Sequence, residues 1–134
     1  NYPHRKLLME YVAIVTLLLL IQYTIYSMLC GMARGKDTVV APATSGDEAY
    51  ERAFRVQMNT LEQLAVTLPA MWICALFFSP LWAAGLGVVF MLGRLLYRQA
   101  YTKDPATRGP GMMIGFFANM VMIVLGMWGA LSVM

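Results

Sequence analysis

The chain has 134 residues, of which 60% are hydrophobic and only 13% are charged, and its mean hydropathy is +0.62. Soluble domains usually contain about 45–50% apolar and about 25% charged residues. The composition therefore excludes a disordered chain and argues against an ordinary soluble domain. The length accommodates about four membrane-crossing helices with short connections.

The net charge of +3 and the pI of about 9.0 come from basic residues that are clustered along the chain. This clustering makes a nucleic-acid partner unnecessary as an explanation. Cys30 and Cys74 each lie inside an apolar stretch. Two such residues are too few for a disulfide framework and lie in the wrong setting for a zinc site. We expect both to be buried, and we expect no metal cofactor.

The first predicted element is a membrane helix at about residues 7–33. Residues 11–33 carry no charge, and at 1.5 Å per residue this run exceeds the ~30 Å hydrocarbon core. A signal peptide is the alternative, but its apolar centre is usually only about 7–15 residues long. Residues 35–46 are rich in Gly, Pro, Ser, Thr and Ala and predict a loop.

The next charge-free run covers residues 63–93 and is interrupted by Ser79 and Pro80. Because proline cannot continue a helix and restricts the residue before it, the run splits into two helices. The acidic pair Asp47 and Glu48 favours a helix start well before the run. We therefore predict the second and third helices at about residues 47–78 and 81–103.

A breaker cluster at residues 108–111 is followed by a charge-free run that extends to the end of the chain. This pattern predicts a fourth helix at about residues 110–133. The short turns favour antiparallel neighbours. The expected fold is therefore an all-α integral membrane bundle of four helices in up-down order.

Basic residues divide unequally between the two ends of this bundle. The end with both termini carries two, and the opposite end carries six, namely Arg34, Lys36, Arg52, Arg98, Lys103 and Arg108. By the positive-inside rule, the loops at residues 34–47 and 103–109 are cytoplasmic. Short loops and the lack of an evident retention signal favour a bacterial inner membrane over the endoplasmic reticulum.

The second helix contains three polar residues, Arg55, Asn59 and Glu62, at steps of four and three. This spacing predicts that they share one face of the helix. Ionisable groups at membrane depth normally face protein or a water-filled cavity. A structural pair between Arg55 and Glu62 that joins helices is one explanation. A functional site is the other, because further polar residues, Gln57 among them, lie nearby.

The third helix carries Arg94, Tyr97 and Tyr101 at steps of three and four, and Arg108 follows seven residues later. All four lie near one face if the helix continues that far. Tyrosines at this depth are also typical of an interfacial belt. The two polar faces together would form a pocket for a small ligand with a carboxylate and an ammonium group, and a nearby guanidinium would favour a thiolate.

At these residues the sequence resembles the family of membrane-associated proteins in eicosanoid and glutathione metabolism (MAPEG). Residues 51–62, ERAFRVQMNTLE, are similar to its second-helix motif with E-R, R-x-Q-x-N and N-x-x-E elements. Residues 93–101, GRLLYRQAY, are similar to its third-helix motif R-x-x-Y-x-x-x-Y. The resemblance runs from about Tyr50 to Arg108 and is greatest to the branch of leukotriene C synthase and the microsomal glutathione transferases.

The resemblance implies a homotrimer that binds glutathione between neighbouring subunits, near the cytosolic side. One subunit would contribute Arg55, Asn59 and Glu62, and its neighbour Arg94, Tyr97 and Tyr101. Arg34 and Gln57 are further glutathione-binding candidates. Arg108 matches the arginine that stabilises the glutathione thiolate in this branch, and an ordinary loop charge is its alternative.

Two positions depart from the family pattern. Gln63 stands where the branch often has tyrosine, which changes a possible hydroxyl contact. Arg34 is followed by Gly35, whereas leukotriene-forming members carry adjacent basic residues there. The second departure argues against leukotriene formation but leaves glutathione binding intact.

Three functions follow as hypotheses. The first is a membrane-bound glutathione transferase, in which the thiolate attacks a lipophilic electrophile from the bilayer or reduces a lipid hydroperoxide. The second is a four-helix proton-coupled multidrug transporter, with Glu10 or Glu62 as the proton carrier. The third is a catalytically inactive glutathione-binding scaffold. The presence of the whole motif set favours the first.

Overall fold

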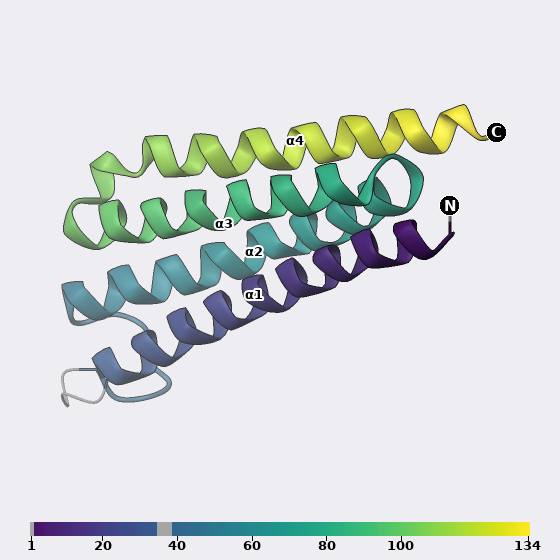
Figure 1. Cartoon of the computed structure of the whole chain (residues 1–134). Helices are drawn as coiled ribbons and strands as arrows, with labels where there is room; N and C mark the ends of the chain where they lie inside the picture. The colour runs from purple at the N-terminus through teal and green to yellow at the C-terminus, as the bar shows by residue number, and fades with distance from the viewer. Residues whose placement is uncertain (1, 35–38) are drawn as a thin grey trace.

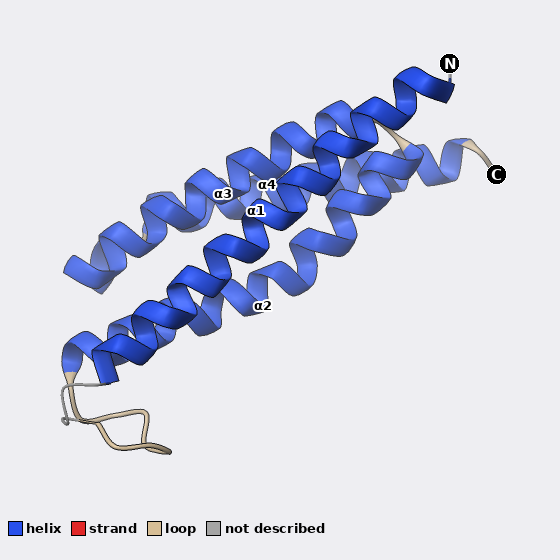
Figure 2. Cartoon of the chain, turned by 60° about the horizontal axis from the view of Figure 1, so that its bottom comes forward, coloured by secondary structure: helices blue, strands red, loops and turns tan. Residues whose placement is uncertain are grey.

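The computed structural model describes residues 2–34 and 39–134, with side chains from residue 8 onward, as four α-helices and one 3₁₀ helix (Figure 1). The α-helices are α1 (Tyr2–Arg34), α2 (Glu48–Phe77), α3 (Pro80–Lys103) and α4 (Gly109–Ser132). The 3₁₀ helix η1 (Pro105–Thr107) precedes α4. Figure 2 shows helices and connecting loops without a strand in this described part.

The helices run antiparallel in chain order. Both termini and the α2–α3 turn lie at one end of the bundle, and the α1–α2 and α3–α4 connections lie at the other (Figure 1). Helices α2 and α3 occupy the middle and each packs against both α1 and α4. The predicted four-helix up-down bundle is confirmed.

Each of the four helices is long and apolar enough to cross a membrane. The two shortest, α3 and α4, have 24 residues each, which corresponds to about 36 Å at 1.5 Å per residue. Large hydrophobic side chains such as Leu17, Phe117 and Trp128 are exposed on the outside of the bundle. An apolar surface of this extent suits lipid contact rather than water.

Helix boundaries follow from local capping. The Asp47 carboxylate accepts a hydrogen bond from the Tyr50 backbone N–H at 2.9 Å and caps α2. Ser79 caps α3 in the same way, accepting from the Trp82 N–H at 3.3 Å, so Pro80 falls at the first helical position, where its missing N–H is harmless. Helix α1 begins at Tyr2 rather than residue 7, because Pro3 is likewise tolerated in a first turn.

Helix α3 ends where the sequence predicts and does not continue to Arg108. The helix ends at Lys103, with Asp104 as its C-cap, because Pro105 cannot continue it. Arg108 therefore does not lie on the α3 face with Arg94. It is instead the residue that precedes the first turn of α4.

The core is apolar through most of the bundle and fully buries Leu19, Met71, Phe90 and Met122. Cys30 and Cys74 are free and buried, which confirms the prediction for both.

The backbones of α3 and α4 are in contact near Gly111. A Cβ atom added there would lie only 2.5 Å from the Tyr97 backbone nitrogen. This contact fixes the position of α4 beside the polar residues of α3.

Candidate functional site

Arg94 is the centre of the polar part of the bundle. Its side chain comes from α3 and is only 2% exposed. The Arg94 Nη2 group donates to Asn59 Oδ1 at 2.8 Å and to Thr60 Oγ1 at 3.0 Å, both on α2. Its guanidinium carbon lies 4.3 Å from the centre of the Tyr97 ring. A single chain therefore already joins the polar residues of α2 and α3.

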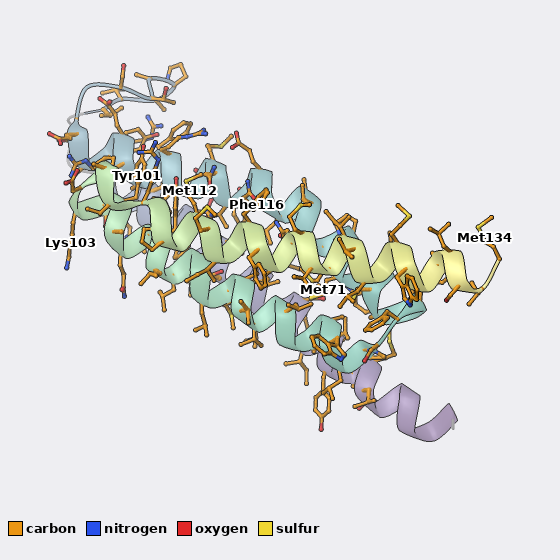
Figure 3. All side chains as sticks on the ribbon, turned by 90° about the horizontal axis from the view of Figure 1, so that it is seen from above. Met71, Tyr101, Lys103, Met112, Phe116 and Met134 are labelled. Atoms are coloured by element: carbon orange, nitrogen blue, oxygen red, sulfur yellow. The ribbon has the colours of Figure 1, made fainter. Side chains whose placement is uncertain are left out.

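The two tyrosines of α3 continue this cluster toward the loop end. The rings of Tyr97 and Tyr101 stack with centres 5.4 Å apart. Tyr97 is buried, and Tyr101 is partly exposed at the end of the bundle that carries the α3–α4 turn (Figure 3). The cluster therefore combines one buried guanidinium with two stacked phenol rings.

Arg55 and Glu62 lie on the outer face of α2. Arg55 Nη2 and Glu62 Oε1 are 3.4 Å apart, and the side chains are 49% and 51% exposed. Because both belong to α2, this ion pair does not join two helices of the chain.

Asn59 does not share that outer face. It is 8% exposed and points to Arg94, so the prediction of one common face is wrong for this residue. The physical reason is that an α-helix turns about 100° per residue, so Asn59 is rotated by about 60° from Glu62.

A polar hollow of about 460 Å³ lies at the loop end of the bundle. It brings Arg55 of α2 together with Tyr101 of α3, and side chains of both charge signs line it. The lining residues are Thr44, Glu48, Glu51, Arg52, Phe54, Arg55, Tyr101 and Pro105. We name it the loop-end hollow.

A second cavity of about 250 Å³ lies among α2, α3 and α4. Asn59, Gln63 and Arg94 form its polar wall, and α4 supplies the rest through Met112, Met113, Gly115 and Phe116. Met112 and Phe116 lie about one helical turn apart on α4 (Figure 3). We name it the Arg94 cavity.

Five of the nine candidate residues line neither the loop-end hollow nor the Arg94 cavity, namely Arg34, Gln57, Glu62, Tyr97 and Arg108. Arg34 donates to the Ala43 carbonyl at 2.8 Å and to the Tyr50 hydroxyl. Gln57 Nε2 donates to the Tyr23 hydroxyl at 3.1 Å. Both side chains thus already have partners within the chain.

Arg108 is exposed at the start of α4, where its Nη1 donates to the Pro105 carbonyl at 2.9 Å. It forms no ion pair with a described carboxylate. The Arg108 guanidinium lies at the N-terminal end of α4, where the helix dipole is positive. Both positive charges favour an anion there.

The sequence analysis did not predict a further polar network between α2 and α4. Thr67 Oγ1 donates to Asn119 Oδ1 at 2.7 Å, and Asn119 Nδ2 donates to Gln63 Oε1 at 3.4 Å. An amide inside the otherwise apolar fourth helix is the signal that could have pointed to this network. Among the described residues, no group of three His, Cys, Asp or Glu side chains could hold a metal ion.

Comparison with known proteins places these motifs in a family. Residues 12–128 match the MAPEG family. The chain is 42% identical to an uncharacterized protein of Synechocystis sp. over 112 residues, covering 84% of this chain and 82% of that protein.

The names of two animal relatives state an activity. Human microsomal glutathione S-transferase 2 is 30% identical over 117 residues, covering 87% of this chain and 80% of the relative. Leukotriene C4 synthase from Bos taurus is 30% identical over 120 residues, covering 90% and 80%. The chain therefore belongs to the MAPEG family.

Proposed function

We propose that this protein is a membrane-bound glutathione transferase. The observation that carries the proposal is the loop-end hollow, which combines Arg55, Tyr101 and the carboxylates of Glu48 and Glu51 at the end of an apolar bundle. Glutathione carries two carboxylates, an ammonium group and a thiol. A hollow with both charge signs suits such a ligand, and the relatives named for glutathione transfer and leukotriene C4 synthesis support the assignment.

The roles follow from the chemistry of each side chain. Arg55 binds a glutathione carboxylate through its forked donors, and Glu62 accepts the ammonium group. These groups now contact each other at 3.4 Å while remaining half exposed. An exposed pair of this kind contributes at most about 1 kcal/mol, so glutathione can replace it at small cost.

The remaining residues define the walls of the site. Asn59, Arg94, Tyr97 and Tyr101 orient the bound peptide. Arg34 and Gln57 join the site by exchanging their present tyrosine partners for glutathione. In the homotrimer that we propose, the neighbouring subunit completes the site at the exposed face of α2.

Arg108 stabilises the thiolate. A free thiol has a pKa of about 8.5, and a nearby guanidinium at a helix N-terminus favours its deprotonation. The thiolate sulfur then forms a bond to the electrophilic carbon of a lipophilic co-substrate, and the leaving group departs with the bonding electrons.

Lipid hydroperoxide reduction is a companion activity. The thiolate attacks the peroxide oxygen, the O–O bond breaks, and the lipid alcohol leaves. A second glutathione reduces the resulting glutathione sulfenic acid and gives glutathione disulfide and water.

The protein acts within a bacterial inner membrane in this proposal. Described basic residues at the loop end include Arg52, Arg98 and Lys103, and the positive-inside rule assigns this end to the cytoplasm. Lys36, which we counted with them, lies outside the described residues. Glutathione would therefore enter from the cytoplasm and the co-substrate from the bilayer.

The decisive experiment mixes detergent-purified protein rapidly with glutathione and follows thiolate absorbance in the ultraviolet together with proton release. We expect thiolate formation at neutral pH in the wild type and in Arg98→Ala, which removes a guanidinium from the same end of the bundle. We expect Arg108→Ala to lose it while remaining folded. Full turnover in Arg108→Ala would refute the assigned role.

A further inference from the structure

A groove runs between α1 and α3 on the side of the bundle opposite to the outer face of α2. Helices α2 and α3 pack against each other in the middle, and α1 packs against both, so the outer faces of α2 and α3 point away from each other. Near the loop end, we define this α1–α3 groove by Ile25 and Tyr26 of α1 and by Leu95 and Arg98 of α3. None of these residues lines the loop-end hollow or the Arg94 cavity.

The charge of Arg98 has no anionic partner within the described chain. Four other described basic side chains at the loop end donate hydrogen bonds within the chain, namely Arg34, Arg52, Arg55 and Arg108. Arg98 donates none to a described residue and forms no ion pair with one. Its N–H groups therefore remain available to an anion from outside the chain.

An aromatic ring nevertheless holds Arg98 in one place. The guanidinium carbon lies 5.5 Å from the centre of the Tyr26 ring. The Tyr26 hydroxyl donates to the Arg94 carbonyl at 3.4 Å and accepts from Gln22 Nε2 at 3.3 Å, which fixes the ring. A guanidinium that lies against a fixed ring keeps its forked donors free, and it loses less freedom when an anion binds.

The α1–α3 groove changes from polar to apolar at Arg98. Arg98 is five residues before the end of α3 at Lys103, which places it about 7–8 Å from that helix end and near the boundary between head groups and hydrocarbon. Leu95, one turn deeper on the same side of α3, is exposed, and so is Ile25 on α1. A ligand that contacts all three side chains therefore needs an anionic group next to an alkyl chain.

We propose that the α1–α3 groove binds an anionic phospholipid from the loop-end leaflet. The lipid phosphate accepts hydrogen bonds from the Arg98 guanidinium, and an acyl chain lies against Leu95 and Ile25. Basic pockets between membrane helices bind anionic head groups in this way. A zwitterionic lipid fits less well, because the cation beside its phosphate is repelled by Arg98.

The test is native mass spectrometry of the full chain, released from detergent micelles that contain equal amounts of phosphatidylglycerol and phosphatidylcholine with the same acyl chains. The two lipids differ in head-group charge, and the measured mass counts the lipids that stay bound. We expect phosphatidylglycerol to bind about threefold to tenfold more strongly than phosphatidylcholine, the range that one basic residue near a membrane surface supplies.

Variants assign this preference to the groove. Arg98→Gln should bring the two lipids to near parity, and Arg98→Lys should weaken phosphatidylglycerol about threefold, because lysine keeps the charge but lacks the forked donors. Lys103→Gln is the matched control. It also removes one positive charge from this end of α3, but the Lys103 side chain extends away from the bundle (Figure 3) and has no described contact with an aromatic ring. Its preference should equal that of the wild type.

The ring is tested separately. Tyr26→Phe keeps the ring and should keep the preference, whereas Tyr26→Leu removes the ring and should weaken phosphatidylglycerol about threefold. Circular dichroism checks that each variant is helical. If Tyr26→Leu does not fold, the comparison of Arg98→Gln with Lys103→Gln decides alone.

Equal binding of the two lipids by the wild type would overturn the proposal, and this is the result expected if a neighbouring subunit covers the groove. Equal losses in Arg98→Gln and Lys103→Gln would also overturn it, because they would show unspecific attraction to the basic end of the bundle. The proposal does not depend on glutathione binding. Thiolate formation without a preference for phosphatidylglycerol would refute only this inference and leave the proposed function standing.

Discussion

Replacing Gly111 with alanine tests whether the close approach of α3 and α4 holds the site together. The added Cβ would lie 2.5 Å from the Tyr97 nitrogen, 2.7 Å from the Tyr97 Cα and 2.9 Å from the Gly93 carbonyl oxygen. Ordinary Cβ contacts begin near 3.4 Å. All three neighbours are backbone atoms, so no side-chain rotation relieves the overlap, and α4 must move away by close to an ångström.

The energetic consequence can be estimated. Overpacking of this kind usually lowers the free energy of unfolding by about 1–3 kcal/mol. Replacing a helical glycine by alanine raises it by about 0.5–1 kcal/mol. We therefore expect a net loss of about 1–2 kcal/mol for Gly111→Ala. Gly85→Ala is the matched control, because it lies within α3 and an added Cβ meets nothing within 4 Å. It should stabilise the protein by up to about 1 kcal/mol.

Thermal unfolding in detergent gives the comparison directly, with a lower melting midpoint for Gly111→Ala and an unchanged or higher one for Gly85→Ala. Because Arg108 immediately precedes α4, the displacement should also lower the fraction of glutathione held as thiolate. Equal melting midpoints for the two variants would refute the packing argument. A lower melting midpoint with an unchanged fraction of thiolate would show that the packing of α4 supports stability but not the position of Arg108.

Three further predictions concern polar contacts. Arg52→Met should destabilise the protein by about 1–2 kcal/mol in thermal unfolding, because Arg52 Nη1 donates to the carbonyls of Thr102 at 3.1 Å and Lys103 at 2.8 Å at the end of α3. Glu62→Gln should change stability by less than about 1 kcal/mol but weaken glutathione at least about tenfold in a binding titration. Asn119→Leu removes two hydrogen bonds to α2 and should cost about 1 kcal/mol, at about 0.6 kcal/mol for each, and a melting midpoint that rises instead would contradict this.

The number and order of the helices could be predicted because charge-free runs and breaker clusters are local signals. Proline shows the limit of that reasoning. Pro80 starts α3, but Pro69 lies inside the continuous helix α2. The difference is the residue before each proline, since Ser79 supplies an N-cap and Leu68 does not. A rule that treats every proline as a break would have divided α2.

The candidate site could be predicted only along single helices. Spacing along α3 predicted that Tyr97 and Tyr101 share a face, where their rings stack. Spacing along α2 predicted the same for Arg55 and Glu62, which form an ion pair. Which face of α2 meets α3 depends on how the helices are rotated about their axes. Spacing does not contain that rotation, so it grouped Asn59 with its exposed neighbours although it bonds Arg94.

Helix α3 is held on its two sides by different physical means, and this explains where the polar cavity forms. Toward α2, Arg94 forms hydrogen bonds that hydrocarbon cannot replace. Toward α4, Gly93 and Gly111 allow backbone contact without any polar group. Because Gly93 and Arg94 are adjacent, the backbone contact with α4 begins one residue from the guanidinium's own position in α3. The α4 residues just after Gly111 are thereby fixed beside Arg94, and they form the apolar wall of a cavity whose other wall is charged.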